Sequence, residues 1–571
     1  MSFGKKSNSS LPDLPEIENA NNFSKYFIQK IDKIREDLDS KTCPDPTFSP
    51  FSKIPLSSFD PVTENEVREI ILDSPSKHCN LDPLPTTLLK ESIDCLLPSI
   101  TCLINDSLLS GNVPKSFKNA IVKPLLKKPG LDPNILKNYR PVSNLPFLSK
   151  ILEKVVLKRL LAHLNSNDLN EIYQSAYKKY HSTETALLKV FNDIACELDE
   201  KNVVVLSLLD LSAAFDTIDH SILLTRLNSS FGIQGVALEW FKSYLQSRTQ
   251  CVQIGSCFSE PASLKFGVPQ GSVLRPVLFT LYTSPLSNIF NFFDILYHLY
   301  ADDSQLYKGC LFSDLNLTIN KNELCIKDTK IWMDSNKLKL NDEKTEFTVL
   351  KNKHQIKDHI DCKMTINDIE IESTPNLRNL GIMFDEDLSL SYHINSIFKS
   401  ATFHLSRISS IRKFLTTDVT KTLVVNFILL RLDNCNSLFC SLSNEYIDKL
   451  QILQNHAARL IFRAKKKDHI TPLLMSLHLL PIRFRIEYKI AVICFKCING
   501  LAPIYLKNIL EIYKPTRALR SAQDNLIFKK PVMNYKSYGE KSFYFYGPFV
   551  WNSLPFQLRD SQNIDIFKKT S

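Results

Sequence analysis

Glycine is scarce in this sequence, which has 13 glycines in 571 residues, against an average usage of about 7% in proteins. Propellers, β-helices and other turn-dense all-β folds need many glycines, so the sequence argues against them and favours a chain rich in helix. The hydrophobic fraction of 44% is ordinary for a globular interior and excludes wholesale disorder. At about 150 residues per domain, we expect two to four domains.

Long apolar runs and a secretory signal are also missing. The run at residues 423–430 is typical and stays well short of the roughly 18 to 20 residues that cross a bilayer. The first residues include no apolar segment, and the 14 cysteines are scattered without a regular framework. We therefore expect an intracellular, reduced protein with no membrane span, in the nucleus or the cytoplasm. The formal charge of +10 fits a polyanionic partner, or lysines that serve solubility alone.

The periodicity of apolar residues predicts a mixed chain. A buried strand is expected at 203–209, followed by a helix with Asp216 or Thr217 near its cap, and two strands within 290–307 joined at 301–303. A further strand is expected at 121–126, and 514–536 is expected to be rich in loops. Helical spacing is found at 23–38, 64–72, 84–109, 148–164, 447–461 and 482–498.

Two acidic sites lie at the ends of the expected strands. One is Tyr-Ala-Asp-Asp at 300–303, a string that alone is weak and compatible with a plain surface turn. The other is Asp210, directly after the buried strand. Carboxylates on adjacent strand ends suit Mg²⁺, so Asp210 and Asp302, with Asp303 beside them, are expected to hold two ions about 3.5 to 4 Å apart for phosphoryl transfer.

The ordered segments that contain these acids resemble a known family. They include LDPLPTTLLK from Leu81, NYRPVSNLPFLSKILEK, QSAYKKYHSTETALLKV, LLDLSAAFDTIDHSILL, FGVPQGSVLRPVLFTLY, YADD, KLKLNDEKTE, LGIMFDEDLSL and RLDNCNSL. Together they resemble the reverse transcriptases of non-LTR (LINE-type) retrotransposons, most like the jockey-like and related animal groups. The resemblance implies an α+β right-hand polymerase with fingers, a palm with an antiparallel sheet, a thumb, and helical N-terminal and C-terminal extensions.

The resemblance also implies roles for single residues. Asp210, Asp302 and, less directly, Asp303 would be ligands of two Mg²⁺ ions, with Mn²⁺ as a substitute. Phe215 would exclude the ribose 2′-hydroxyl, unless it is only a core phenylalanine. Lys344 would lie near the triphosphate as a general acid, unless it is only a solvated lysine.

Further contacts to the nucleotide follow from the same resemblance. Gln270 and Gly271 would contact the nascent base pair, and Arg140 and Lys178 would bind the triphosphate. Lys178 stands where the family usually has arginine, so the bidentate contact is lost. Arg275 stands where the family usually reads glycine. If that glycine has positive φ or touches the template, arginine would strain the loop by about 1 to 2 kcal/mol or block the groove, and Arg275→Gly would raise activity.

The remaining features are weaker. The tract Arg463, Lys465, Lys466 and Lys467 is either a thumb face for template and primer or a solvated charge run. Cys494 and Cys497 have half the spacing of a zinc site but lie within a helical pattern, so we interpret them as core thiols.

The sequence thus predicts an RNA-directed DNA polymerase that binds an RNA template, a DNA primer or target, and deoxynucleoside triphosphates, and no membrane; its oligomeric state stays open. The alternatives are a catalytically inactive relic that binds RNA as a scaffold, and a host enzyme with the same palm. We expect the polymerase part of a larger element protein, without its N-terminal endonuclease. The expected divisions are a leader with one amphipathic helix at 1–60, a helical extension of the fingers at 61–110, fingers and palm at 111–385, a helical thumb at 386–510 and a polar region at 511–571.

Overall fold

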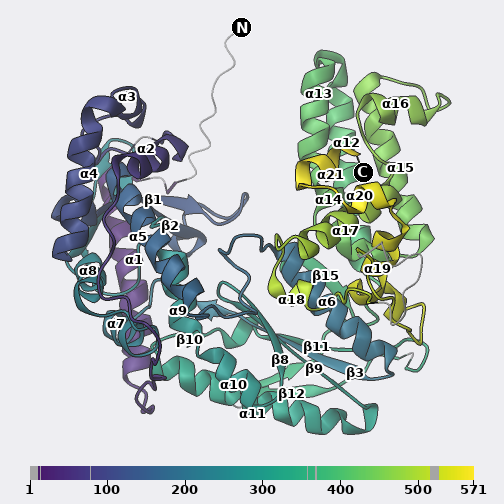
Figure 1. The fold of residues 1–571 in the computed structure, drawn as a ribbon, viewed down its shortest axis with the longest axis horizontal. Helices are drawn as coiled ribbons and strands as arrows, with labels where there is room; N and C mark the ends of the chain where they lie inside the picture. The colour runs from purple at the N-terminus through teal and green to yellow at the C-terminus, as the bar shows by residue number, and fades with distance from the viewer. Residues whose placement is uncertain are drawn as a thin grey trace. The chain divides into compact units, whose positions relative to one another are not determined.

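The structure is a computed structural model, and the residues it describes form two compact units through which the chain passes alternately (Figure 1). The described residues are 11–12, 14–77, 79–356, 358–366, 369–514 and 526–570. Unit 1 comprises Met1–Glu171, Leu211–Ser287 and Asp328–Asn341, and unit 2 comprises Ile172–Asp210, Asn288–Lys327 and Asp342–Ser571. Helices and antiparallel sheets occur together, so the expected α+β class is confirmed.

Unit 1 is built around a sheet that an N-terminal helix covers. In this sheet β1 pairs antiparallel with β2 and parallel with β5, and β5 also pairs with β6 and β7. Helix α1 packs on β5 and buries Phe23 and Phe27 against Tyr139 and Val252. The helical pattern expected at 23–38 is therefore real and forms one core with the sheet. The elements are α1 (Glu16–Asp39), β1 (Asn119–Leu126), β2 (Tyr139–Asn144), β5 (Arg248–Ile254), β6 (Cys257–Phe258) and β7 (Ala262–Leu264).

The other helices of unit 1 pack on one another. Helix α2 contacts α4 and α5, while α7 contacts α8 and α9. Two short strands, β4 and β10, pair antiparallel. These elements are α2 (Glu64–Asp73), α3 (Thr86–Glu91), α4 (Ile93–Ser110), α5 (Phe147–Ser166), β4 (Leu211–Ser212), α7 (His220–Ser229), α8 (Gly235–Leu245), α9 (Arg275–Thr283) and β10 (Lys339–Leu340); α10 (Leu286–Phe292) and α11 (Leu315–Ser335) cross the boundary between the units.

Helix α4 differs from the expectation that no segment is long and apolar enough to span a bilayer. By length and composition alone α4 passes that test, with a mean hydropathy of 1.2. It was missed because polar residues interrupt its apolar run. Its Leu97, Ile100 and Ile104 are buried, and the helix contacts α2 and α8. Core helices of globular units meet the same criterion, so it is weak support for a membrane segment.

Unit 2 contains a four-stranded antiparallel sheet in the order β11-β3-β9-β8. Strand β3 is buried along almost its whole length because strands flank it on both sides and α6 packs against it. A reciprocal capping box between Ser182 and Thr185 fixes the start of α6. The elements are α6 (Thr183–Asp199), β3 (Val203–Leu209), β8 (Leu296–Tyr300), β9 (Asp303–Cys310) and β11 (Glu346–Leu350).

After this sheet come two hairpins and a helical assembly. The large core of unit 2 runs from α6 and β3 through these helices, where Trp551 is fully buried. The hairpins are β12 (Lys363–Ile366) with β13 (Ile369–Glu372), and β14 (Asn376–Asn379) with β15 (Ile382–Asp385). The helices are α12 (Ser391–Ile411), α13 (Thr417–Val424), α14 (Leu430–Asp433), α15 (Asn444–Phe462), α16 (Ile470–Ser476), α17 (Ile482–Ile498), α18 (Ile504–Lys507), α19 (Phe543–Ser553), α20 (Phe556–Arg559) and α21 (Ile564–Thr570), with a π-helical turn at Val425–Leu429.

Three local expectations need correction. Helix α7 is capped by Asp219, whose Oδ1 accepts from the amide of Ser221 at 2.9 Å, and not by Asp216 or Thr217. The first residues of 290–307 belong to α10, and the strand begins only at Leu296. The C-terminal part expected to be polar holds α19, where Phe543 and Trp551 are buried. Residues 515–525 of the expected loop-rich stretch lie outside the described residues. Cys494 and Cys497 are buried in α17, as core thiols should be.

Candidate active site

The acidic turn of unit 2 is the tight connection between β8 and β9. Tyr300 pairs with Asp303, so Ala301 and Asp302 form the tip, and Ala301 has φ 56°, a left-handed conformation. On the neighbouring strand, Leu209 pairs with Ser304. Because the pairing is antiparallel, Asp210 follows at the end of β3 beside Asp303. Three acids that are distant in sequence therefore meet at one edge of the sheet.

The proton affinity of Asp303 reflects this crowding. Burial, followed by the like charges of Asp302 and Asp210, raises the pKa of Asp303 to about 6, against the opposing charge of Lys344. Carboxylates that repel each other in this way favour a bound cation, because a cation offsets the repulsion.

Lys344 also lies at this edge. It ends a short 3-10 turn directly before β11, which pairs with β3. Its Nζ donates to Oδ2 of Asp210 at 2.8 Å. The Lys344 side chain is 64% exposed and that of Asp210 is 25% exposed, so the ammonium remains accessible to an incoming ligand. The structure thus brings together four of the residues singled out in the sequence.

Gln174 is a supporting residue that no pattern in the sequence singles out. Its Oε1 accepts from the amide of Ala301 at 3.1 Å and from the amide of Ala176 at 2.9 Å, and its Nε2 donates to the carbonyl of Ala301 at 3.4 Å. The residue is 1% exposed. Gln174 therefore fixes the backbone of the acidic turn from a segment that bridges to Leu299 of β8. It begins the segment QSAYKKYHSTE, but no local pattern ties it to a turn 127 positions away.

The oxygen donors at this edge suit Mg²⁺, although the site is not a closed cage. Among the described residues, no group of three or more His, Cys, Asp or Glu side chains is arranged to hold a metal ion by itself. Mg²⁺ usually retains waters and binds through one or two carboxylates plus substrate phosphates, so such a cage is not required. The carboxylates and the raised pKa of Asp303 fit that ion.

Lys178 lies elsewhere in unit 2, in the turn before α6. Its carbonyl accepts from the amide of His181 at 3.3 Å, and its neighbours Tyr177 and Tyr180 both have positive φ. Burial lowers the pKa of His181, and the charge of Lys178 contributes to this shift. This tight turn and the N-cap residue Ser182 lie between Lys178 and the first residue of α6, Thr183.

In unit 1, Phe215 lies on a loop that is tied to the Gln270 segment. The amide of Val268 donates to the carbonyl of Phe215 at 3.3 Å, and the amide of Ser143 donates to the carbonyl of Gln270 at 2.8 Å. Gly271 has φ +119°, and an added Cβ would collide with the carbonyl oxygen of Ser143. Glycine is therefore required at 271 for both the conformation and the close approach.

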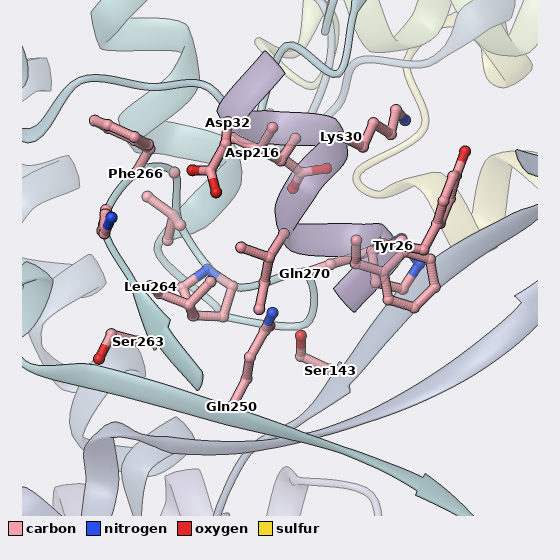
Figure 2. Close-up of a pocket in the computed structure, with 18 of the residues that line it drawn as sticks. Tyr26, Lys30, Asp32, Ser143, Asp216, Gln250, Ser263, Leu264, Phe266 and Gln270 are labelled. Atoms are coloured by element: carbon pink, nitrogen blue, oxygen red, sulfur yellow. The ribbon is translucent and has the colours of Figure 1, made fainter. Parts of the chain in front are cut away.

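A cavity in unit 1 adjoins this segment. It is lined by α1, by the sheet and by residues 263–270, and Figure 2 shows Asp216 and Gln270 among its lining side chains, with Tyr26 and Lys30 from α1. Arg140 is exposed on β2, opposite Leu125 of β1. Phe215, Gln270, Gly271 and Arg140 thus belong to unit 1, whereas the acids, Lys344 and Lys178 belong to unit 2.

The strain expected at Arg275 is absent. Arg275 begins α9 and is not among the described residues with positive φ. The turn before it is held by Glu153 of α5, whose Oε2 accepts from Ser272 Oγ at 2.6 Å and from the amide of Val273 at 2.7 Å. Glu153 is 1% exposed, and an acid inside the apolar stretch ILEKVV was an overlooked sign of such a role.

Comparison with known proteins finds that this chain is similar to a polymerase family and to polymerases of mobile elements. Residues 126–384 match the family described as reverse transcriptase (RNA-dependent DNA polymerase). The chain is similar to the RNA-directed DNA polymerase from mobile element jockey of Drosophila melanogaster, with 29% identity over 63% of this chain and 39% of the relative. It is also similar to the probable RNA-directed DNA polymerase from transposon BS of the same fly, with 25% identity over 70% of this chain and 43% of the relative. The match thus spans about two fifths of the length of these relatives.

Proposed function

We propose that the chain is the RNA-directed DNA polymerase of a non-LTR retrotransposon, because residues 126–384 match the reverse transcriptase family and the chain is similar to the polymerase from mobile element jockey. It adds deoxynucleotides to a primer 3′-hydroxyl on an RNA template. The observation that carries this proposal is the meeting of Asp210, Asp302 and Asp303 at one sheet edge, where the pKa of Asp303 rises to about 6. Its partners are an RNA template, a DNA primer or target, and deoxynucleoside triphosphates, inside the cell.

The acids hold the metal in this proposal. Asp210 and Asp302, with Asp303, bind two Mg²⁺ ions or Mn²⁺ in their place. When bound, these ions supply Lewis-acid stabilisation of the attacking and leaving oxygens. Gln174 keeps the acidic turn in one backbone conformation, so its carboxylates are oriented before the substrate arrives.

The proton of the leaving group is assigned to Lys344. Its ammonium is mostly exposed and is held 2.8 Å from Asp210, near the metal-binding edge. As pyrophosphate leaves, Lys344 donates a proton to it. Arg140 and Lys178 bind the triphosphate in this scheme, Lys178 as a point charge without the bidentate contact of arginine.

The remaining site residues select and align the nucleotide. Phe215 fills the space that a ribose 2′-hydroxyl needs, and Gln270 and Gly271 contact the nascent base pair. The close approach of Gly271 to Ser143 supports a loop of fixed shape at this place. The cavity beside Gln270 leaves room next to the loop.

The division of labour follows the same scheme. Fingers and palm occupy 111–385, with the sheet β11-β3-β9-β8 as the palm core, and the helices of 386–510 form the thumb. The exposed residues Arg463, Lys465, Lys466 and Lys467 after α15 lie on the thumb face that binds template and primer phosphates, which suits sequence-independent binding.

Primer extension on poly-rA with an oligo-dT primer and labelled dTTP tests the proposal. We expect incorporation that requires Mg²⁺ or Mn²⁺, stops with a chelator and is lost in Asp302→Ala. Parent protein that is folded and binds the primer-template, yet incorporates nothing, would instead identify an RNA-binding relic.

A further inference from the structure

The Arg275 guanidinium joins two loops of unit 1. Its Nη1 donates to the carbonyl of Val268 at 2.7 Å, and its Nη2 donates to Oδ1 of Asp216 at 2.9 Å. The Arg275 side chain is 11% exposed and that of Asp216 is 31% exposed, so water screens this pair less than a surface ion pair. The rigid fork of arginine can reach both acceptors at once, which a lysine cannot do.

The same guanidinium lies over the ring of Phe215, 4.8 Å from its centroid. The Phe215 ring also packs against Phe279, with centroids 4.2 Å apart. Arg275 and Phe279 are four residues apart on α9, so they share one face of the helix. This face holds the ring of Phe215 through a cation–π contact and an aromatic contact.

Asp216 gives this contact a second consequence. Its carboxylate also lines the cavity next to Gln270 (Figure 2). Without Arg275, the negative charge of Asp216 would face this cavity, which adjoins the proposed nucleotide contacts. Arg275 offsets that charge and keeps phosphates from being repelled.

We infer that Arg275 is a positioning residue for sugar selection: it holds the Phe215 ring in place and neutralises Asp216, so that the polymerase rejects ribonucleotides. This inference rests on the proposed function. It replaces the expectation that Arg275 obstructs the site, because the side chain is used in specific contacts and its backbone is helical.

The experiment measures the ratio of kcat/KM for dTTP over UTP in primer extension on poly-rA. For Arg275→Gly we expect this ratio to fall at least about tenfold, because the Phe215 ring is no longer held. Arg275→Lys should give an intermediate ratio, since lysine keeps the charge but loses the fork and the stacking. In the double variant Arg275→Gly with Asp216→Asn, the KM for dTTP should return to the parental value because the unpaired charge of Asp216 is gone. The dTTP/UTP ratio should stay low because the Phe215 ring is still not held. The double variant thus separates the effect of charge from that of the ring.

Arg159→Gln is the matched control. Arg159 is another poorly exposed arginine of unit 1 (13%), paired with Glu66 at 2.9 Å. Losing it destabilises the unit but should leave the dTTP/UTP ratio unchanged. Hydrogen exchange gives a readout that needs no turnover: the Val268 amide, bonded to Phe215, should exchange faster in Arg275→Gly and not in Arg159→Gln.

Two outcomes overturn the inference in different ways. If the parent incorporates dTTP with an Asp302-dependent rate but Arg275→Gly keeps the parental ratio within twofold, the positioning role fails and the proposed function stands. If the parent incorporates neither nucleotide, the proposed function fails and the role in sugar selection fails with it.

Discussion

The acidic turn of unit 2 and the Arg275 loop of unit 1 differ in how far their carboxylate charge is neutralised. At the turn, Asp210, Asp302 and Asp303 lie together, and the positive charge of Lys344 opposes their repulsion only in part. The pKa of Asp303 therefore rises to about 6. At the loop, Asp216 is paired with the poorly exposed Arg275. A turn with net negative charge attracts metal ions. A loop whose carboxylate is neutralised does not, and it can serve as a fixed surface for contacts of shape.

Both regions nevertheless use the same means to hold their backbone. In each region a buried polar side chain from a distant segment accepts a hydrogen bond from a backbone amide of the turn. Gln174 accepts from Ala301, and Glu153 accepts from Val273. The difference therefore lies in the charge that each turn presents, and not in how rigidly each is held. Charge and backbone support can be altered separately by substitution.

Removing a charge from the acidic turn should have the largest effect. We expect Asp302→Asn to lower kcat at least about 1,000-fold, because a carboxylate that we propose to hold the metal is lost while side-chain volume is kept. Single-nucleotide primer extension measures this. Asp314→Asn, at an exposed acid of the same unit, should keep parental activity. A matching loss in both variants would mean that the turn has no special role.

Removing the support of the turn should come next. Gln174→Ala leaves the charges in place but loses the contacts to Ala301, and we expect kcat to fall about 100-fold because the carboxylates lose their orientation. The matched control is Gln454→Ala, at a buried glutamine of α15 that donates to the carbonyl of Leu480. It should reduce stability without a comparable loss of turnover. Equal kcat losses in the two variants would contradict a specific role for Gln174.

The loop of unit 1 can be strained without altering a charge. Gly271→Ala places a methyl group against the carbonyl of Ser143 at φ +119°, and we expect it to lower the free energy of unfolding by about 2 kcal/mol. Gly130 also has positive φ, +87°, but no atom lies within 4 Å of a Cβ added there. Gly130→Ala should therefore lower the free energy of unfolding by only about 1 kcal/mol. Urea unfolding of both variants compares them. Equal costs would show that the approach to Ser143 is not tight in solution.

The smallest expected effect concerns pH and the strand that leads into the acidic turn. Burial lowers the pKa of His298 from 6.5 to about 3, so the folded protein favours the neutral imidazole. Burial of the neutral imidazole therefore contributes fully to the stability of the fold above pH 6.5. This contribution is lost as the pH falls toward 3, because the unfolded chain gains a proton that the folded protein does not accept. Between pH 7 and pH 5.5 we expect a loss of about 1 kcal/mol in the free energy of unfolding.

Denaturant titrations at the two pH values provide the measurement for His298. His298→Gln should flatten the dependence, and His354→Gln, at an exposed histidine of the same unit, should leave it as in the parent. An unchanged slope in His298→Gln would exclude His298 as its source.

The sequence predicted what local patterns determine. Strand β3 and helix α17 have the bounds expected from their apolar residues, since a continuous apolar run and a 3.6-residue period are each properties of one segment. Asp210, Asp302 and Asp303 were expected to lie together because they end strands, and the pairing of β3, β9 and β8 brings them together. Lys344 was selected only through the resemblance, and its neighbourhood with Asp210 comes from the structure. Their catalytic roles stay predictions.

The supporting contacts could not be predicted in the same way. Gln174 and Ala301 are 127 positions apart, and Glu153 and Leu274 are 121 apart, so only the folded chain relates them. Arg275 was interpreted as an obstruction because a departure from a resembled pattern carries no information about its partners. Asp216 and Phe215 give it partners that the residue type alone does not reveal.

The alternation of the chain between the two units has a consequence for biosynthesis. Unit 1 depends on its last segment: β10 completes the pair with β4, and the hydroxyl of Tyr282 donates to the carbonyl of Asn336 at 2.6 Å. A ribosome must therefore translate β3, β8 and β9 of unit 2 before unit 1 can finish folding. Nascent chains that stop before residue 328 would expose unpaired polar groups in unit 1, and such fragments should be targets for chaperones or proteolysis.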